Sequence, residues 1–256
     1  MKALVCYKWV PDEADIVVDQ QSKTLNMDKV KYKISEYDRN AVELGVTLNE
    51  KSGYEVVSLT VGKGVQASTK DVLARGIEKA YVVESEELDS SVSAKVIAEA
   101  VKKIGDVDVI ICGEGSGDQY SQQVGPRVAA LLGYKLVTYA ASVEANGGEL
   151  MVERKLEEGT EVVKVQGPVV VTVLSEINQP RIPGMKQILA AKKKPVEEFG
   201  LTDLGFTAEK LEANIKVMNV GPSIMDRKQI RLNEGGVSVK DAVANLVQQL
   251  KANKDI

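Results

Sequence analysis

The chain of 256 residues contains no histidine. Without an imidazole it cannot build a Ser-His-Asp triad, a histidine metal site or histidine acid–base chemistry. Hydrolases of the triad type are therefore excluded, and no catalytic residue is predicted.

Cysteine is also scarce, because the chain has only Cys6 and Cys112. Two distant cysteines make neither a disulfide framework nor a zinc site, so no metal site is predicted. Both lie at the ends of apolar, strand-like runs. We expect buried free thiols in a reducing compartment, since free cysteine is usually buried.

The chain lacks a basic surplus, with 33 Lys and Arg against 37 Asp and Glu, which argues against nucleic acid as a partner. The N-terminal stretch "MKALVCYKWVPDEAD" has too short an apolar run for a signal peptide. No stretch approaches the roughly 18 apolar residues that a membrane-spanning helix needs. We expect a soluble, cytoplasmic protein without a direct membrane span.

The first half of the chain alternates between strand-like and helix-like patterns. Short apolar runs predict four strands, at 3–10, 54–62, 79–85 and 107–113. Helical spacing lies between and after them, at 36–51, around Val72, Leu73 and Ile77, and at 90–105 and 122–133. This alternation predicts an α/β fold with a doubly wound, mostly parallel sheet.

The pattern changes after residue 135 into consecutive strand-like runs, with a hairpin signal at Asn146-Gly147-Gly148. They predict an antiparallel extension of the sheet that ends in an apolar strand at 169–174. From residue 178 the chain shows little core-forming pattern until an amphipathic helix at 238–253. We predict a nucleotide-binding domain over 1–177 and a partner-binding arm over 178–256.

The turn after the fourth expected strand, "GEGSGDQYSQQVG", concentrates glycines, amides and hydroxyls directly before a helix. Backbone N–H groups at a helix N-terminus favour anions, and glycines let a ligand approach closely. No Gly-Lys-Ser/Thr follows, so this is not the phosphate loop of an ATPase. We expect either a nucleotide phosphate site or an ordinary strand-to-helix loop, with Asp118 holding a ribose hydroxyl or capping the helix.

Three further turns are expected beside the same crevice, because parallel sheets bind ligands at the carboxyl ends of their strands. They are "YKWVPD", "ISEYDRNAVE" and "TVGKG". More ordinary roles are open, since Trp9 could simply cover the core and Ser35 and Asp38 could only cap a helix. Outside the crevice, Lys192–Lys194 could bind phosphate or an acidic partner or face solvent, and Met185 on a polar loop could anchor a partner.

Several segments, in this order, resemble the beta subunit of electron-transfer flavoproteins, particularly the FixA-like branch. They include "LVCYKWVPD", "ISEYDRNAVE", "DVIICGEGSGDQYSQQVGPRVAALLG", "VERKLEEGTEVV" and "NQPRIPGMKQILAAKKKP", and the resemblance covers nearly the whole chain. It implies a Rossmann-like fold of the adenine nucleotide alpha-hydrolase type. It also implies a heterodimer with an alpha subunit that carries most of one FAD.

The resemblance implies an adenine nucleotide in the crevice of this subunit as well. In the housekeeping branch it is a structural AMP; in bifurcating and Fix-type members it is a second FAD, which accepts hydride from NADH. Two features favour FAD here. Glu13 stands where some members carry an aromatic residue, and the loop ends in "QQVGP", as in the bifurcating branch.

The implied partners are an acyl-CoA dehydrogenase-like or quinone-oxidoreductase protein and, as a low-potential acceptor, ferredoxin or flavodoxin. Any membrane association would come through partner subunits. Met185 falls in the family's recognition loop, where an apolar side chain docks into the dehydrogenase. Together with Lys8 and Gly62 of neighbouring turns, the implied cofactor-binding residues are Cys6, Ser35, Glu36, Tyr37, Asp38, Val61, Gly113, Glu114, Gly115, Ser116, Gly117, Asp118, Gln119, Tyr120, Ser121, Gln122, Gln123 and Val124.

Two alternatives are kept. One is a non-bifurcating beta subunit that holds AMP. The other is an adenine-nucleotide-binding stress or signalling module, which accounts for the first 135 residues but not for the extension and the arm. An adenylating or ATP-hydrolysing enzyme would need a phosphate-loop lysine or metal-binding carboxylates, and no convincing set is present.

Overall fold

The computed structural model describes residues 1–19, 21–86, 88–207, 211, 213, 215–223, 229–254 and 256. The chain forms two compact units. The first comprises Met1–Val17 and Asn26–Asn219, and the second Val18–Leu25 and Val220–Ile256. Among the described residues, no helix is long and apolar enough to cross a bilayer.

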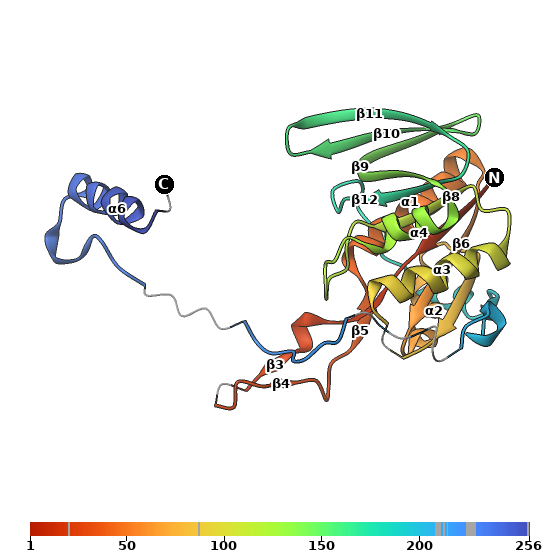
Figure 1. The fold of residues 1–256 in the computed structure, drawn as a ribbon, viewed down its shortest axis with the longest axis horizontal. Coiled ribbons are helices and arrows are strands. Elements are labelled where there is room, and N and C mark those ends of the chain that lie inside the picture. Colours follow the sequence, from red (N-terminus) through yellow and green to blue (C-terminus); the bar gives the residue numbers. More distant parts are fainter. Residues whose placement is uncertain are drawn as a thin grey trace. The chain divides into compact units, whose positions relative to one another are not determined.

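The first unit is built on a nine-stranded sheet with the order β11-β10-β9-β12-β8-β1-β6-β7-β13 (Figure 1). From β9 to β13 all neighbours in this order are parallel, whereas β10 is antiparallel to β9 and β11. The predicted α/β fold is therefore confirmed. The strands are β1 (Lys2–Cys6), β6 (Glu55–Gly62), β7 (Lys79–Glu84), β8 (Val109–Gly113), β9 (Lys135–Asn146), β10 (Glu149–Leu156), β11 (Gly159–Gln166), β12 (Val169–Val173) and β13 (Val196–Glu198).

Helices cover both faces of this sheet. They are α1 (Glu36–Ser52), α2 (Thr69–Ala74), α3 (Ser90–Ile104), α4 (Val124–Leu132) and α5 (Met185–Ala191). Side chains of α1 and α2 join one apolar core, and those of α3 and α4 join the other. Because strand side chains alternate between faces, Val5 of β1 belongs to the first core, whereas Leu4 and Cys6 belong to the second.

The strand expected at 169–174 is β12, and its position differs from the expectation. It does not close the antiparallel extension but lies parallel between β8 and β9. All five of its residues are buried. An unbroken apolar run needs cover on both faces, which the interior of the sheet supplies and an edge does not.

Two other predicted elements are shorter in the structure. The strand expected at 3–10 is split into β1 and β2 (Trp9–Pro11), because the Lys8 N–H donates to the Asp38 carboxylate at 2.8 Å. β2 pairs with β5 (Tyr32–Ile34). The α2 helix ends at Ala74, and Ile77 is buried just beyond it.

The hairpin predicted at Asn146-Gly147-Gly148 is confirmed. Asn146 pairs with Glu149 across a two-residue turn. Both glycines have positive φ, at 58° and 88°, as a type I′ turn requires. The remaining short elements of the first unit are η1 (Glu13–Asp15), η2 (Val65–Ser68) and η3 (Thr202–Leu204). Two further short strands are β3 (Val17–Val18) and β4 (Leu25–Asn26). Val17 and Asn26 belong to the first unit, and Val18 and Leu25 belong to the second.

The boundary between the two compact units lies after Asn219 and not at the predicted position between residues 177 and 178. Residues 178–219 belong to the first unit, where β13 extends the sheet and Phe199 and Phe206 are buried. The second unit contains η5 (Glu234–Gly236) and the predicted helix, α6 (Val239–Asn253), of which no described residue is buried. The partner-binding role of 178–256 stays a prediction.

Candidate functional site

A pocket opens at the carboxyl ends of β1 and β8, where the order of the strands reverses. From β1 the sheet continues to β6 and β7 on one side, and from β8 to β12 on the other. This switch point is where open α/β sheets bind ligands. Most of the predicted cofactor residues line it: Cys6, Lys8, Asp38, Val61, Gly113, Glu114, Gly115, Ser116, Gln119, Ser121, Gln122, Gln123 and Val124.

The other predicted residues do not line the pocket. Ser35, Tyr37, Gly117, Asp118 and Tyr120 instead shape the loop that does, as described below. The remaining two are Glu36 and Gly62, of which Glu36 is exposed beside Lys33.

Asp38 of α1 ties the ends of the two central strands together. Its carboxylate accepts the N–H of Lys8 at 2.8 Å and the N–H of Gly113 at 3.0 Å. Burial raises the pKa of Asp38 to about 7, although the two N–H donors and Lys8 act to lower it. Asp38 is thus a brace of the pocket floor and does not merely cap α1.

The glycine-rich loop is held in a defined shape by neighbouring side chains. Ser35 accepts the N–H of Gly117 at 3.2 Å, so its hydroxyl binds this loop and does not cap α1. The Tyr120 hydroxyl donates to Glu114 at 2.5 Å, and the Tyr120 ring lies 5.2 Å from that of Tyr37.

The same loop is closed by an ion pair between Lys8 and Asp118, whose Nζ and Oδ2 atoms are 2.5 Å apart. Burial of Asp118 acts to raise its pKa, but hydrogen bonds from Lys8 and Ser116 outweigh it and lower the pKa. Asp118 therefore has a cation beside it already, and neither caps α4 nor lines the pocket.

The backbone of the loop is unusual at Tyr120 and Gln122, which have positive φ of 45° and 56°. Such conformations are costly for residues other than glycine and gather at functional sites. They lead directly into α4, whose N-cap residue Gln123 makes no capping hydrogen bond. The first N–H groups of α4, at Val124 and Gly125, are thus available at the pocket wall.

A second helix, α3, also begins at the pocket; the helix was predicted at 90–105, but the place of its first residues at the pocket was not. Ser90 and Ser93 of α3 line it. Leu59, Leu88 and Ile97 add an apolar wall. The sequence contains a signal for this, because the serines of "SSVS" follow the strand 79–85 and begin a helix. This turn has no glycine-rich stretch of the kind that marks the other turns.

Cys6 and Cys112 are free and buried, as predicted. Both line the pocket from adjacent strands. A hydrogen bond with Cys6, together with burial, raises the pKa of the Cys112 thiol. The two buried cysteine side chains make this part of the floor apolar. Within the described ranges, no cluster of three or more His, Cys, Asp or Glu could hold a metal ion.

Outside the pocket, Trp9 packs against the core and stacks on Tyr32, the ordinary role considered for it. Lys194 is not a solvated charge, since its Nζ donates to the carbonyls of Leu73 and Ile77 at 3.2 and 2.7 Å. Met185 opens α5 and is 73% exposed, so an apolar side chain does stand free on this loop.

The fold and the pocket define a doubly wound α/β protein with a pocket at the switch point of its sheet. Residues 23–204, more than two thirds of the chain, match the family model of the electron transfer flavoprotein domain. The chain therefore belongs to the electron transfer flavoprotein family. Proteins of this family form heterodimers with partner subunits.

Proposed function

We propose that the chain is the beta subunit of a heterodimeric electron-transfer flavoprotein and that its pocket holds FAD. The observation that supports this most is the donor set at the switch point. Backbone N–H groups of a glycine-rich loop and of the α4 N-terminus meet uncharged side chains there, at Ser116, Ser121 and Gln122. Such donors suit a pyrophosphate that is retained and not hydrolysed.

The pocket divides into two chemical parts that fit such a ligand. The loop 113–125 and the start of α3 would hold phosphate and ribose groups. The apolar side chains of Leu59, Val61 and the two cysteines would pack against a flat ring. FAD, when bound, supplies the redox chemistry, so the chain needs no histidine or metal of its own. Its residues bind, orient and exclude water.

We further propose that the complex oxidises NADH and divides the two electrons. One would go to the branch of the alpha-subunit FAD and a quinone or dehydrogenase partner, the other to ferredoxin or flavodoxin. The likeness of "QQVGP" to the bifurcating branch and the Glu13 position support this over an AMP-holding subunit. The expected location of this activity is the cytoplasm.

The nucleotide content of the co-purified heterodimer tests this proposal. Acid extraction followed by chromatography should yield two FAD per heterodimer. One FAD with one AMP would make the chain a non-bifurcating subunit. A homodimer that binds ATP without a flavoprotein partner would instead favour the stress or signalling class.

For the partner oxidoreductase we propose docking on the segment Ile182–Leu189. Ile182 is 92% exposed and Met185 73%, and Ile188 and Leu189 follow on α5 with 43% and 54% exposed. Apolar side chains gathered this way on a surface typically mark a protein contact. An acyl-CoA dehydrogenase-like or quinone-oxidoreductase protein with an apolar pocket is the partner that fits the family.

A further inference from the structure

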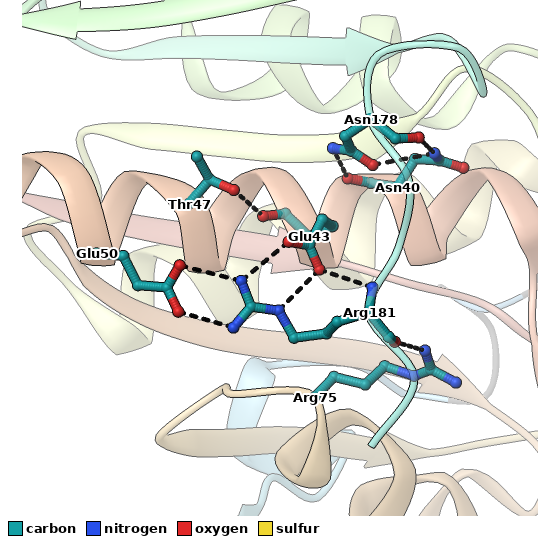
Figure 2. Close-up of polar contacts among 7 residues, drawn as sticks. All are labelled: Asn40, Glu43, Thr47, Glu50, Arg75, Asn178 and Arg181. Carbon is teal, nitrogen blue, oxygen red and sulfur yellow. Dashed lines mark hydrogen bonds and ion pairs between the residues drawn. The ribbon is translucent and has the colours of Figure 1, made fainter. Parts of the chain in front are cut away.

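The segment that precedes this exposed surface is fixed to α1 by one arginine. The Arg181 guanidinium donates to both oxygens of Glu43, at 2.8 and 2.9 Å, and to both oxygens of Glu50, at 2.7 and 3.1 Å. Figure 2 shows the two glutamates directed from α1 toward the guanidinium. Bidentate pairs of this kind fix orientation as well as distance.

Backbone groups of the same segment are held too. The Arg181 N–H donates to Glu43 at 2.9 Å, and its carbonyl accepts from Arg75 at 3.0 Å. One turn earlier on α1, the Asn40 amide donates to the carbonyl of Asn178 at 2.8 Å, and the Asn178 amide returns a bond of 3.0 Å to the Asn40 carbonyl (Figure 2). The backbone is thus pinned at two points before it reaches the surface.

The contrast with the next residues is sharp. Arg181 makes ion pairs with two carboxylates, whereas Ile182 is 92% exposed. Only three residues separate Arg181 from Met185, and one of them, Pro183, has a fixed φ. The orientation of the anchor side chains therefore depends on where Arg181 is held.

We propose that Arg181 is a positioning residue, which presents Ile182 and Met185 in the geometry that the partner oxidoreductase binds. The inference rests on the docking function proposed above. Binding is weakened when a loop must be ordered at the moment of contact, and a segment already fixed avoids that cost. Glu43 and Glu50 supply the carboxylates that bind Arg181, so α1 holds the segment that leads to the exposed residues Ile182 and Met185.

The test uses the co-purified heterodimer with Arg181→Gln, which removes the charge and the forked geometry. Arg154→Gln is the matched control, because Arg154 pairs with Glu161 at 2.9 Å on the β10–β11 hairpin. An acyl-CoA dehydrogenase with its acyl-CoA serves as electron donor, and a dye as terminal acceptor. Hydrogen exchange of residues 178–191 is followed in parallel.

We expect Arg181→Gln to speed exchange in 178–191 and to raise the KM for the heterodimer about tenfold, with kcat and nucleotide content unchanged. Arg181→Lys should restore part of the KM, and Glu50→Gln, which leaves the Glu43 pair, should shift it less. Arg154→Gln should leave the KM at the wild-type value. These milder variants also decide the matter if Arg181→Gln fails to fold.

Two results would count against the inference in different ways. An unchanged KM in an active Arg181→Gln complex, whatever the exchange rates, overturns the positioning role alone. Absence of electron transfer between the wild-type complex and both an acyl-CoA dehydrogenase and a quinone oxidoreductase overturns the docking function, and the inference with it.

Discussion

At the residue scale, the space around each glycine of the switch-point loop decides whether a larger residue can replace it. A Cβ at Gly113 would lie 2.7 Å from the Tyr37 Cβ and 2.9 Å from the Tyr37 carbonyl carbon. Backbone cannot move aside as a side-chain tip can. In contrast, a Cβ at Gly117 would meet no atom within 4 Å among the described residues.

Gly113→Ala should therefore lower the free energy of unfolding by about 1–3 kcal/mol, the usual cost of overpacking, and release bound nucleotide. Gly117→Ala is the matched control and should change neither. Urea unfolding and the nucleotide content of the purified variants measure both effects. Equal losses in the two variants would contradict this account of the loop.

Asp38 makes the stability of the fold depend on pH. Because burial raises its folded-state pKa to about 7 from 3.8, the folded state holds a proton that the unfolded state loses between these values. The stability contributed by the protonated form is thus present below about pH 4 and is lost as pH rises toward about 7.

Asp38→Asn should show this, because an amide stays neutral throughout. The free energy of unfolding of the wild type, minus that of Asp38→Asn, should decrease between about pH 5 and about pH 8. Urea unfolding at the two pH values measures the difference. Parallel changes in both proteins would mean that Asp38 is already ionised at the lower pH.

At the element scale, α1 serves two surfaces. The N-cap residue Ser35 and Asp38 of the first turn brace the pocket, and the later turns hold the segment 178–181. A different element, α6, presents an apolar stripe at helical spacing without a buried residue. The stripe consists of Val239, Val243, Leu246, Val247 and Leu250.

We expect this stripe to contact the alpha subunit. Val243→Asp should raise the dissociation constant of the heterodimer about tenfold or more, because it places a charge in an apolar contact. Gln248→Asp, on the opposite face of the helix, is the control and should leave assembly unchanged. Analytical ultracentrifugation measures the dissociation, and equal behaviour of the two variants would place the contact elsewhere.

At the scale of the whole molecule, a ligand bound at the switch point would join both halves of the sheet. It would contact β1, β6 and β8 as well as the starts of α3 and α4. A ligand that binds only the folded state stabilises it in proportion to the logarithm of its concentration over Kd. The stability of the complex should therefore depend on nucleotide.

Removal of nucleotide from the heterodimer should lower its thermal midpoint. Readdition of FAD at about 100 times its Kd should restore about 2.7 kcal/mol of stability. Differential scanning calorimetry measures both, with GMP as the control nucleotide. Full recovery with AMP and none with FAD would favour the AMP-holding alternative.

Local signals determined much of the fold. Apolar runs of strand length and helical spacing predicted the parallel sheet. The helices predicted at 90–105 and 122–133 each finish on a glycine, and Gly105 and Gly133 have positive φ just past α3 and α4. Such features depend on neighbours within a few residues, so the sequence alone carries them.

The tertiary structure decided the contacts between residues that are distant in the chain. Ser35 occupies the predicted N-cap position, yet its hydroxyl binds Gly117, and Asp38 joins two strand ends 105 positions apart in the chain, at Lys8 and Gly113. Arg181 meets Glu43 across 138 positions. No periodicity records such pairs, because only the closing of the sheet brings them together. The sequence by itself determined the elements and the glycine-rich turn; the packed fold decided which side chains brace the pocket and which hold the surface.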